Sequence, residues 1–506
     1  MTSGLWRRFE VVVAQRGEAP AIIQGDCRVS FSELRIRAAE AAATMVRFGV
    51  MPGDRCLVWA GNSPELAAAL LGAWMIGAIV ALVNDEAPVT HLSHAAGVTR
   101  PRVAFVDEKC ADIAAGTLDC PVLVLGSEAA DPLTPSARGL MHDLEPASIF
   151  FTSGSMGPPK GVTQNHATLL AGCRMVAEHL GLRPDDRILC PIPWAFDYGY
   201  GQLLSTVLLG VTQILPVARN PFALCEAVTA HSPTVFAGLP SIFALLLRGL
   251  SPLRETDLGS LRLVTNTGGL IPPAIYADVR QVFGHCDISL NYGMTETYRS
   301  AGLPVALAGE HPHSVGFGYP GVRLNVLRES GEEAEPDEIG EIIHRGTGAF
   351  MGYWGAPEAT AKVLRPDPLW GYAGIPAPNV VFTGDLGWKT AEGLLVIKGR
   401  RDRQIKSMGV RVSPDEIETM IRATGLVRDV AIVGTPHEIM GEMIVAAVVA
   451  PADAPDPVPA LKVFARKQMS QHMQPRAWHV MDSFPLTPNG KTDFISLRNN
   501  LSQGGG

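Results

Sequence analysis

The sequence predicts an α/β protein with a large N-terminal domain and a small α+β domain at its C-terminal end. Short apolar runs such as CLVWA at 56–60 and SIFFT at 148–152 alternate with helix-like stretches, a pattern typical of buried strands in layered sheets. From about residue 311 the runs become short, alternating and glycine-rich, which indicates antiparallel strands. After the charged run GRRDRQIK at 399–406, strands and a helix follow in a pattern of their own.

The chain has 506 residues, enough for two to four domains or subdomains at roughly 100–200 residues each. The domain boundary is expected near Asp402, inside the charged run. It divides the chain into an N-terminal domain, residues 1–400, and a C-terminal domain, residues 401–506.

The composition favours a folded protein that does not act on nucleic acid. Apolar residues make up 47 % of the chain and charged residues 18 %, and the net charge is −8 without a basic stripe. The eight cysteines form no CxxC pair and have no zinc-ligand spacing, so we expect free thiols in the cytoplasm.

The run Leu66–Val83 is long and apolar enough to raise the question of a membrane span. It follows Ser63-Pro64-Glu65, which has the pattern of a helix start, and Gly77 divides it. We therefore expect a buried helix, a stop at Gly77 and a buried strand, with no membrane span.

The first chemistry-bearing motif follows the strand SIFF. Glycines let successive backbone N–H groups face an anion, while hydroxyls and one lysine add donors that suit a polyphosphate. It is not a P-loop, because no G-K-[ST] closes it. Alone, it could equally be a Gly/Pro/Ser turn. The motif comprises Thr152, Ser153, Gly154, Ser155, Met156, Gly157, Pro158, Pro159, Lys160 and Gly161.

Two further motifs lie at the ends of predicted strands. In 291–297 (NYGMTET), Glu296 could hold Mg²⁺ and Thr295 a phosphate oxygen, although a capped helix start gives the same pattern. In 383–385 (TGD), Asp385 could accept hydrogen bonds from ribose hydroxyls, although an Asx turn is the common alternative.

The last two motifs are charged. Arginines in 399–406 could meet ribose or phosphate oxygens, or form a solvated linker. In 485–491 (PLTPNGK), Lys491 could be carried into a distant site by a domain movement, or be an ordinary exposed turn lysine.

In this order and at these separations, the five motifs resemble those of the adenylate-forming superfamily, which includes acyl-CoA synthetases, adenylation enzymes of peptide synthetases and firefly luciferase. The resemblance runs from about residue 10 to 497. It implies a large N-terminal domain of αβαβα-type sheets with a small β-barrel-like subdomain. A hinge then joins it to a small α+β domain that moves as a lid.

The resemblance also implies the reaction. A carboxylic acid reacts with ATP and Mg²⁺ to give acyl-AMP and pyrophosphate, and the acyl group then passes to a thiol. Thr295 contacts the α-phosphate, Glu296 supports Mg²⁺, and Lys491 bridges the acid carboxylate and the α-phosphate. Asp402 matches the hinge, and Gly409 matches a glycine that lets pantetheine pass.

The nucleotide positions implied by the resemblance fall into three groups: Thr152, Ser153, Gly154, Ser155, Gly157 and Lys160 at the β- and γ-phosphates, Gly268, Gly269, Tyr292 and Gly293 around adenine, and Asp385 and Arg400 at the ribose. Met156 departs from the family, which commonly has threonine there. A thioether cannot donate to phosphate, so one hydroxyl contact is lost.

The choice of acid depends on the segment around Asp197. Phe196-Asp197 resembles amino-acid-activating members, in which that aspartate pairs with the substrate ammonium, although Asp197 could instead cap a helix at Tyr198. Arg299 would add the opposite charge, suiting a β-amino or dicarboxylic acid, or could simply pair with a neighbouring acid. The strings FDYG, EIE and YRS also resemble acyl-CoA ligases of bacterial exosortase systems, so a fatty or aryl acyl-CoA synthetase is the alternative.

The other expected pocket positions are Trp194, Gly201, Gly238, Thr265, Thr267 and Asn291. The two glycines are expected to leave room and Tyr198 to narrow the pocket. No carrier-protein segment is visible in the sequence, so the thiol is expected to come from CoA or a separate carrier protein. A luciferase-like oxygenase and a catalytically silent relative are rivals of another class. The silent relative is disfavoured by the retained lysines and carboxylates of the motifs.

Overall fold

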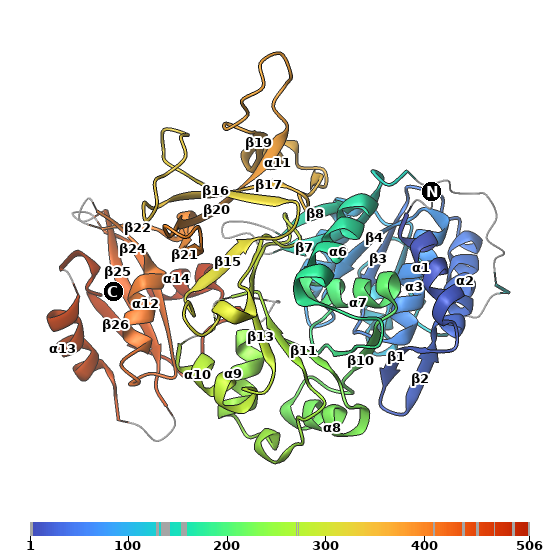
Figure 1. Cartoon of the computed structure of the whole chain (residues 1–506), viewed down its shortest axis with the longest axis horizontal. Helices are drawn as coiled ribbons and strands as arrows, with labels where there is room; N and C mark the ends of the chain where they lie inside the picture. Colours follow the sequence, from blue (N-terminus) through green and yellow to red (C-terminus); the bar gives the residue numbers. More distant parts are fainter. Residues whose placement is uncertain are drawn as a thin grey trace.

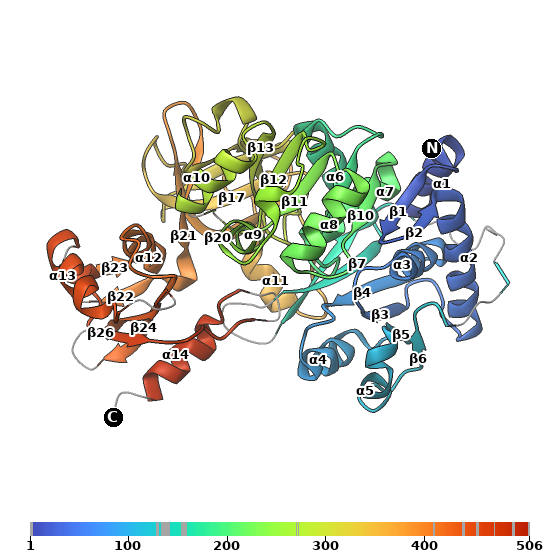
Figure 2. The ribbon, with the colours of Figure 1, turned by 90° about the horizontal axis from the view of Figure 1, so that it is seen from below.

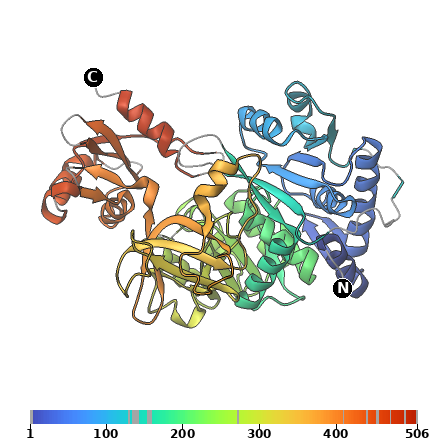
Figure 3. The ribbon, with the colours of Figure 1, turned by 90° about the horizontal axis from the view of Figure 1, so that it is seen from above.

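The computed structural model describes residues 4–127, 131–132, 142–152, 159–269, 271, 273–407, 410–437, 441–451, 455–469, 471–487 and 491–503. Figure 1 shows the first part of the chain, in blue, at one end of the molecule and the C-terminal domain, in orange and red, at the other. The views from below and above, in Figures 2 and 3, show the same separation. Between the two ends lies the yellow and orange antiparallel region (Figure 1).

The first sheet is mostly parallel and, apart from its edge strand β18, is built from the first third of the chain. Its strand order is β18-β8-β7-β4-β3-β5-β6, and β8 is antiparallel to β7. The strand bounds are β3 (Arg55–Trp59), β4 (Ile79–Val83), β5 (Val103–Val106), β6 (Val122–Val124), β7 (Pro146–Thr152), β8 (Lys160–Asn165) and β18 (Gly352–Tyr353).

The second sheet has a parallel half and an antiparallel half. The parallel half, with β2 antiparallel at its edge, runs β13-β12-β11-β9-β10-β1-β2. Its strands are β1 (Pro20–Gln24), β2 (Cys27–Ser30), β9 (Arg187–Leu189), β10 (Thr212–Leu215), β11 (Val235–Gly238), β12 (Leu263–Asn266) and β13 (Asp287–Tyr292).

The antiparallel half continues from β13 through β14, β15, β21, β20, β17 and β16, with β19 on β20. It is the region expected from the glycine-rich alternating segments. Its strands are β14 (Ala301–Gly302), β15 (Ser314–Gly318), β16 (Val322–Leu327), β17 (Gly340–Gly346), β19 (Leu364–Pro366), β20 (Asn379–Lys389) and β21 (Leu395–Arg400).

The helices make three layers around the two sheets, because each sheet buries apolar side chains on both faces. Central helices share one core with Val58 of the first sheet and Ile22 of the second. The central helices are α1 (Gly4–Arg16), α2 (Phe31–Arg47), α3 (Pro64–Ile76), α6 (His166–Leu180) and α7 (Asp197–Leu209). The outer helices are α4 (Val89–Thr99) and α5 (Ala111–Ala115) on the first sheet, and α8 (Pro221–His231), α9 (Pro240–Arg248) and α10 (Pro273–Val282) on the second.

The long apolar run 66–83 folds as the sequence predicts. Ser63 accepts a hydrogen bond from Leu66 N at 3.0 Å and Pro64 opens α3. Gly77 then ends the helix at φ 80°, a left-handed conformation that favours glycine, and the buried strand β4 follows. Within the described residues, no helix is both long and apolar enough to cross a membrane.

The C-terminal region has a sheet of its own, in the order β23-β22-β25-β24 with β26 on β25. Its strands are β22 (Ile405–Ser407), β23 (Val410–Val412), β24 (Asp429–His437), β25 (Gly441–Val449) and β26 (Ala477–Val480). The helices α12 (Pro414–Arg422) and α13 (Val458–Gln468) cover one face and α14 (Phe494–Gln503) the other.

The remaining elements are short: α11 (Pro357–Val363) and the 3₁₀ turns Glu108–Cys110, Leu253–Glu255, Val305–Leu307, Arg401–Arg403 and Gln471–Met473. The αβαβα layers, the antiparallel subdomain and the small α+β domain confirm the predicted fold class.

Candidate active site

The two ends of the predicted triphosphate loop lie on a β-hairpin. Thr152 ends β7 and Lys160 begins β8, and the two residues face each other in the register. The Lys160 Nζ atom lies 5.0 Å from the centre of the Tyr353 ring. The predicted positions Ser153, Gly154, Ser155, Met156 and Gly157 lie outside the described residues.

Glu296 is a buried carboxylate beside this hairpin. Its side chain accepts a hydrogen bond of 2.7 Å from the Tyr353 hydroxyl, and only 8 % of the residue is exposed. Burial raises the pKa of Glu296, although the Tyr353 hydrogen bond opposes this. Gln164 of β8 donates to the backbone carbonyl of Thr295 at 2.8 Å. Tyr353 therefore joins Lys160 and Glu296, which the sequence assigned to two separate motifs.

Asp385, Arg400 and Tyr292 meet where the ends of β13 and β21 lie beside the middle of β20. Asp385 and Arg400 face each other across the β20–β21 pairing, and Arg400 Nη1 lies 3.2 Å from an Asp385 oxygen. The Tyr292 hydroxyl donates to the other Asp385 oxygen at 2.5 Å. Burial, followed by the Asp385 charge, raises the pKa of Tyr292 well above its usual range. Three residues from three motifs thus form one polar cluster.

Asp197 and Arg299 form an ion pair beside Thr295. Arg299 Nη1 lies 2.6 Å from one Asp197 oxygen, and the Thr295 hydroxyl donates to the other at 3.3 Å. Arg299 is 4 % exposed, and its guanidinium lies 4.9 Å from the Tyr198 ring centre and 5.7 Å from the Tyr298 ring centre. Asp197 does not cap α7, because it is the first helical residue and Phe196 occupies the cap position.

The two pocket glycines do not leave room, contrary to the sequence-based expectation. A Cβ atom on Gly201 would lie 3.1 Å from the Tyr298 hydroxyl, and one on Gly238 would lie 2.4 Å from the Phe243 ring. Aromatic side chains from other segments therefore fill both places. Sequence reasoning missed this because those rings come from other elements of the fold.

Several other predicted pocket residues are held inside the core. Tyr198 donates to the Thr265 carbonyl at 2.9 Å, and Asn291 donates to the Thr265 hydroxyl at 2.9 Å. Trp194 and Thr267 are buried as well, at 0 % and 3 % exposure. Their side chains are therefore packed within the fold. Directly after Thr267, Gly268 has a φ of 79°, and Asn266 donates to the Gly269 carbonyl at 3.1 Å.

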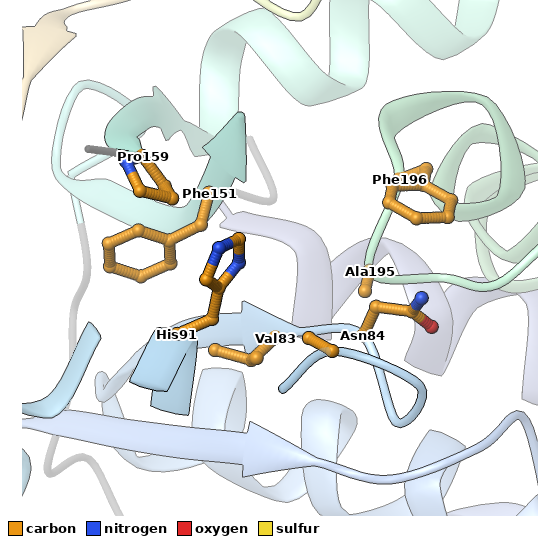
Figure 4. Close-up of a pocket in the computed structure, with 8 residues that line it drawn as sticks. Val83, Asn84, His91, Phe151, Pro159, Ala195 and Phe196 are labelled. Atoms are coloured by element: carbon orange, nitrogen blue, oxygen red, sulfur yellow. The ribbon is translucent and has the colours of Figure 1, made fainter. Parts of the chain in front are cut away.

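A small cavity lies between the first sheet and the segment that precedes α7. Figure 4 shows the His91 ring next to Phe151, with Phe196 on the opposite side. The cavity is lined by Val83, Asn84, Ala87, His91, Phe151, Pro159, Ala195 and Phe196. It thus reaches from the end of the predicted triphosphate loop to the segment predicted to choose the acid.

Lys491 lies on the C-terminal domain and is exposed. Its backbone N–H donates to the Thr487 hydroxyl at 3.2 Å, and its carbonyl accepts from Thr487 N at 2.6 Å. Among the described residues, no hydrogen bond or ion pair joins its ammonium group to Thr295 or Glu296. The turn residues 488–490 lie outside the described residues.

The predicted hinge at Asp402 lies between two arginines that are anchored on opposite sides. Arg401 pairs with Glu341 of β17 at 2.6 Å, whereas Arg403 pairs with Glu418 of α12 at 2.7 Å. Backbone rotation at this point would therefore move one anchored body against the other. Gly409 lies outside the described residues.

The sequence reading missed Tyr353 and Tyr298. Tyr353 follows the string FMG in a segment without a catalytic pattern, and only the pairing of β18 with β8 brings it to Glu296. Tyr298 stands next to Arg299, and its position depends on a backbone turn that no residue pattern announces.

Comparison with known proteins identifies the scaffold. The family model described as AMP-binding enzyme matches residues 9–354, and the model described as AMP-binding enzyme C-terminal domain matches residues 416–491. The ATP-bound crystal structure of MatB from Rhodopseudomonas palustris superposes with a TM-score of 0.87, at 25 % identity, over 99 % of both chains.

Curated relatives come from two kinds of protein. A feruloyl-CoA synthase of Amycolatopsis sp is 30 % identical over 485 residues, covering 94 % of each chain. A dimodular nonribosomal peptide synthase of Bacillus subtilis (strain 168) is 27 % identical over 500 residues. That match covers 97 % of this chain but only 20 % of the synthase.

Proposed function

The chain belongs to the AMP-binding enzyme family and is an AMP-forming acid–thiol ligase, and we propose that its acid is short and carries both an ammonium group and a second carboxylate. The observation that supports this substrate class is the Asp197–Arg299 ion pair beside Thr295. The nucleotide would be ATP with Mg²⁺, and the acceptor would be the thiol of CoA or of a separate carrier protein.

The ion pair neutralises a negative charge that would otherwise lie close to the anionic reactants. The reacting carboxylate and the α-phosphate, both anionic, must meet near Thr295, and an unpaired Asp197 would repel them. Arg299 cancels that charge. An acid with an ammonium group and a second carboxylate could replace both partners of this ion pair. Its ammonium group would bind Asp197, and its second carboxylate would bind Arg299. Neither buried charge would then lose a partner.

The remaining residues suit ATP. Lys160 would meet the β- and γ-phosphates, and Asp385 with Arg400 would hold the ribose, while Tyr292 and the Gly268-Gly269 segment would flank adenine. Glu296 fits Mg²⁺, which commonly binds one or two carboxylates together with substrate phosphates. The metal would supply positive charge to the phosphates and keep this buried carboxylate ionised.

The two half-reactions require different placements of the small domain. Lys491 would enter the site during adenylation, neutralising charge as the acid attacks the α-phosphate. Rotation at Asp402 would then withdraw Lys491 and present the strand face near Gly409 to the thiol. The anchoring of Arg401 and Arg403 on opposite sides supports a hinge at this residue.

A plain aryl or fatty acid is the second candidate. Arg299 already neutralises Asp197, so the site does not need a substrate ammonium to be electrically balanced. The ion pair would then stay closed during the reaction, as one wall of the pocket.

Acid-dependent exchange of labelled pyrophosphate into ATP separates these candidates. The panel compares four-carbon acids of matched length: aspartate has both groups, succinate only the second carboxylate, 2-aminobutyrate only the ammonium, and butyrate neither. Benzoate and dodecanoate represent aryl and fatty acids. The proposal expects the highest kcat/KM for aspartate or its β-amino analogues. Equal or faster exchange with butyrate, benzoate or dodecanoate would overturn it. An Asp197→Ala variant should lose the ammonium-bearing acids selectively.

A further inference from the structure

Tyr298 sits on an unusual backbone turn directly before Arg299. Its φ is 60°, a region that a bulky side chain rarely occupies, and Arg299 N donates to the Thr297 carbonyl at 2.7 Å. A hydrogen bond between residues two apart across a positive φ defines a γ-turn, which is rare and strained. Arg299 also donates from its guanidinium to the Tyr298 carbonyl at 2.5 Å, which helps to hold the turn. Strain of this kind is often kept where a side chain has a functional position.

The turn directs the Tyr298 ring between α6 and α7. A Cβ atom on Gly172 would lie 2.5 Å from the ring, and one on Gly201 would lie 3.1 Å from its hydroxyl. The ring therefore depends on a glycine in each helix. Gly201 is partly exposed although Tyr200 and Gln202 on either side are buried, so α7 is accessible at the position that faces this hydroxyl.

The Tyr298 hydroxyl differs from those of the other buried tyrosines in its hydrogen bonding. In the described part of the chain, each of the other buried tyrosines has a hydroxyl hydrogen bond, whereas that of Tyr298, only 3 % exposed, has none. Those partnered tyrosines are Tyr198, Tyr200, Tyr276, Tyr319 and Tyr353. The Tyr298 oxygen is nevertheless not one of the fully enclosed side-chain atoms that lack a partner, so it borders space that water or a ligand can reach. An unpaired hydroxyl that borders such space is free to bind a ligand.

The geometry points to Tyr298 as the far wall of the acid pocket, where its hydroxyl donates a hydrogen bond to the substituent of the acid farthest from the reacting carboxylate. This inference rests on the proposed function, because it needs an acid bound along α7. It adds a neutral donor to the charges of Asp197 and Arg299.

The placement along α7 supports this arrangement. Asp197 and Gly201 are four residues apart, so they share one face of the helix about one turn, roughly 5.4 Å, from each other. Asp197 meets Thr295 at the reacting end, and the Tyr298 hydroxyl covers Gly201 at the other. Burial, followed by the nearby Cys173, raises the pKa of Tyr298 well above its usual range, so the hydroxyl keeps its proton. The pocket is therefore short and ends on a donor.

The test is a Tyr298→Phe variant of the full chain, which keeps the ring and removes the hydroxyl. Pyrophosphate release is measured with two matched pairs: aspartate with 2-aminobutyrate, and 3-hydroxybenzoate with benzoate. For the pair that the wild type uses, the ratio of kcat/KM for the polar over the unsubstituted acid should fall about tenfold, as expected for a lost hydrogen bond. An unchanged ratio would overturn the inference.

Two further variants separate this role from a packing role. Tyr200→Phe removes a hydroxyl from the same core, bonded to Ser148 at 2.6 Å, and should leave the ratio unchanged. Gly201→Ala places a methyl group against the Tyr298 hydroxyl and should raise KM for the polar acid of the pair that the wild type uses. An unaltered KM would contradict the position of Tyr298 at the far end of the acid pocket. If none of the tested acids makes the wild type release pyrophosphate, the proposed function is refuted as well. If the wild type is active but Tyr298→Phe leaves the ratio of kcat/KM unchanged, only the role of Tyr298 is refuted.

Discussion

The Asp197–Arg299 pair makes an asymmetric prediction for stability. In Asp197→Asn, Arg299 keeps its charge at 4 % exposure and loses its carboxylate partner. Arginine cannot lose its proton in a protein, so this variant should lose about 3–5 kcal/mol of the free energy of unfolding. In Arg299→Met, Asp197 is 21 % exposed and keeps the Thr295 hydrogen bond, so the loss should be smaller, about 1–3 kcal/mol.

The double variant tests whether the two residues act as a pair. It leaves no unpaired charge, and a methionine can fill the space between the tyrosine rings, so its stability should exceed that of Asp197→Asn. Urea unfolding of the four proteins, followed by tryptophan fluorescence, gives the coupling energy. Additive losses, or a larger loss for Arg299→Met than for Asp197→Asn, would refute the view that Arg299 is the charge that depends on its partner.

Two more predictions concern the site, and a third concerns His344, a buried histidine of β17. Lys491→Ala should suppress adenylation strongly and transfer from preformed acyl-AMP to thiol much less, which separate assays of the two half-reactions check; comparable losses would remove Lys491 from its assigned role. Tyr353→Phe removes the 2.7 Å hydrogen bond to Glu296 and should raise KM for Mg·ATP about tenfold while KM for the acid stays constant. Burial lowers the pKa of His344 from 6.5 to about 4, so the neutral form is favoured in the native state. Stability should therefore fall as pH drops from 6.5 towards 4, by up to about 3 kcal/mol, and His344→Gln should lessen that fall in urea titrations at several pH values.

The elements of the fold were predictable where local chemistry and burial agree. α3 stops at Gly77, where the sequence predicts the end of the helix, because the left-handed conformation there favours glycine. The antiparallel subdomain could be placed from its glycine-rich alternation.

The site was predictable only in part, because its contacts join residues far apart in the chain. Tyr292 and Asp385 are 93 positions apart, and Asp197 and Arg299 are 102 positions apart. Residue types suggested that each could bind a ligand, but only the order of the strands and the position of α7 bring the partners together. The misreading of Gly201 has the same cause, since its space is filled by Tyr298, whose positive φ no sequence pattern predicts.

The central claim is that Asp197 and Arg299 neutralise each other in the free enzyme. When the acid binds, its ammonium group and second carboxylate replace these partners. The most direct measurement is acid-dependent exchange of labelled pyrophosphate into ATP for aspartate and butyrate, in the wild type and in the Asp197→Asn/Arg299→Met variant. We predict that the wild type prefers aspartate and that the double variant, which has neither charge, prefers butyrate. The same preference in both proteins would contradict the claim.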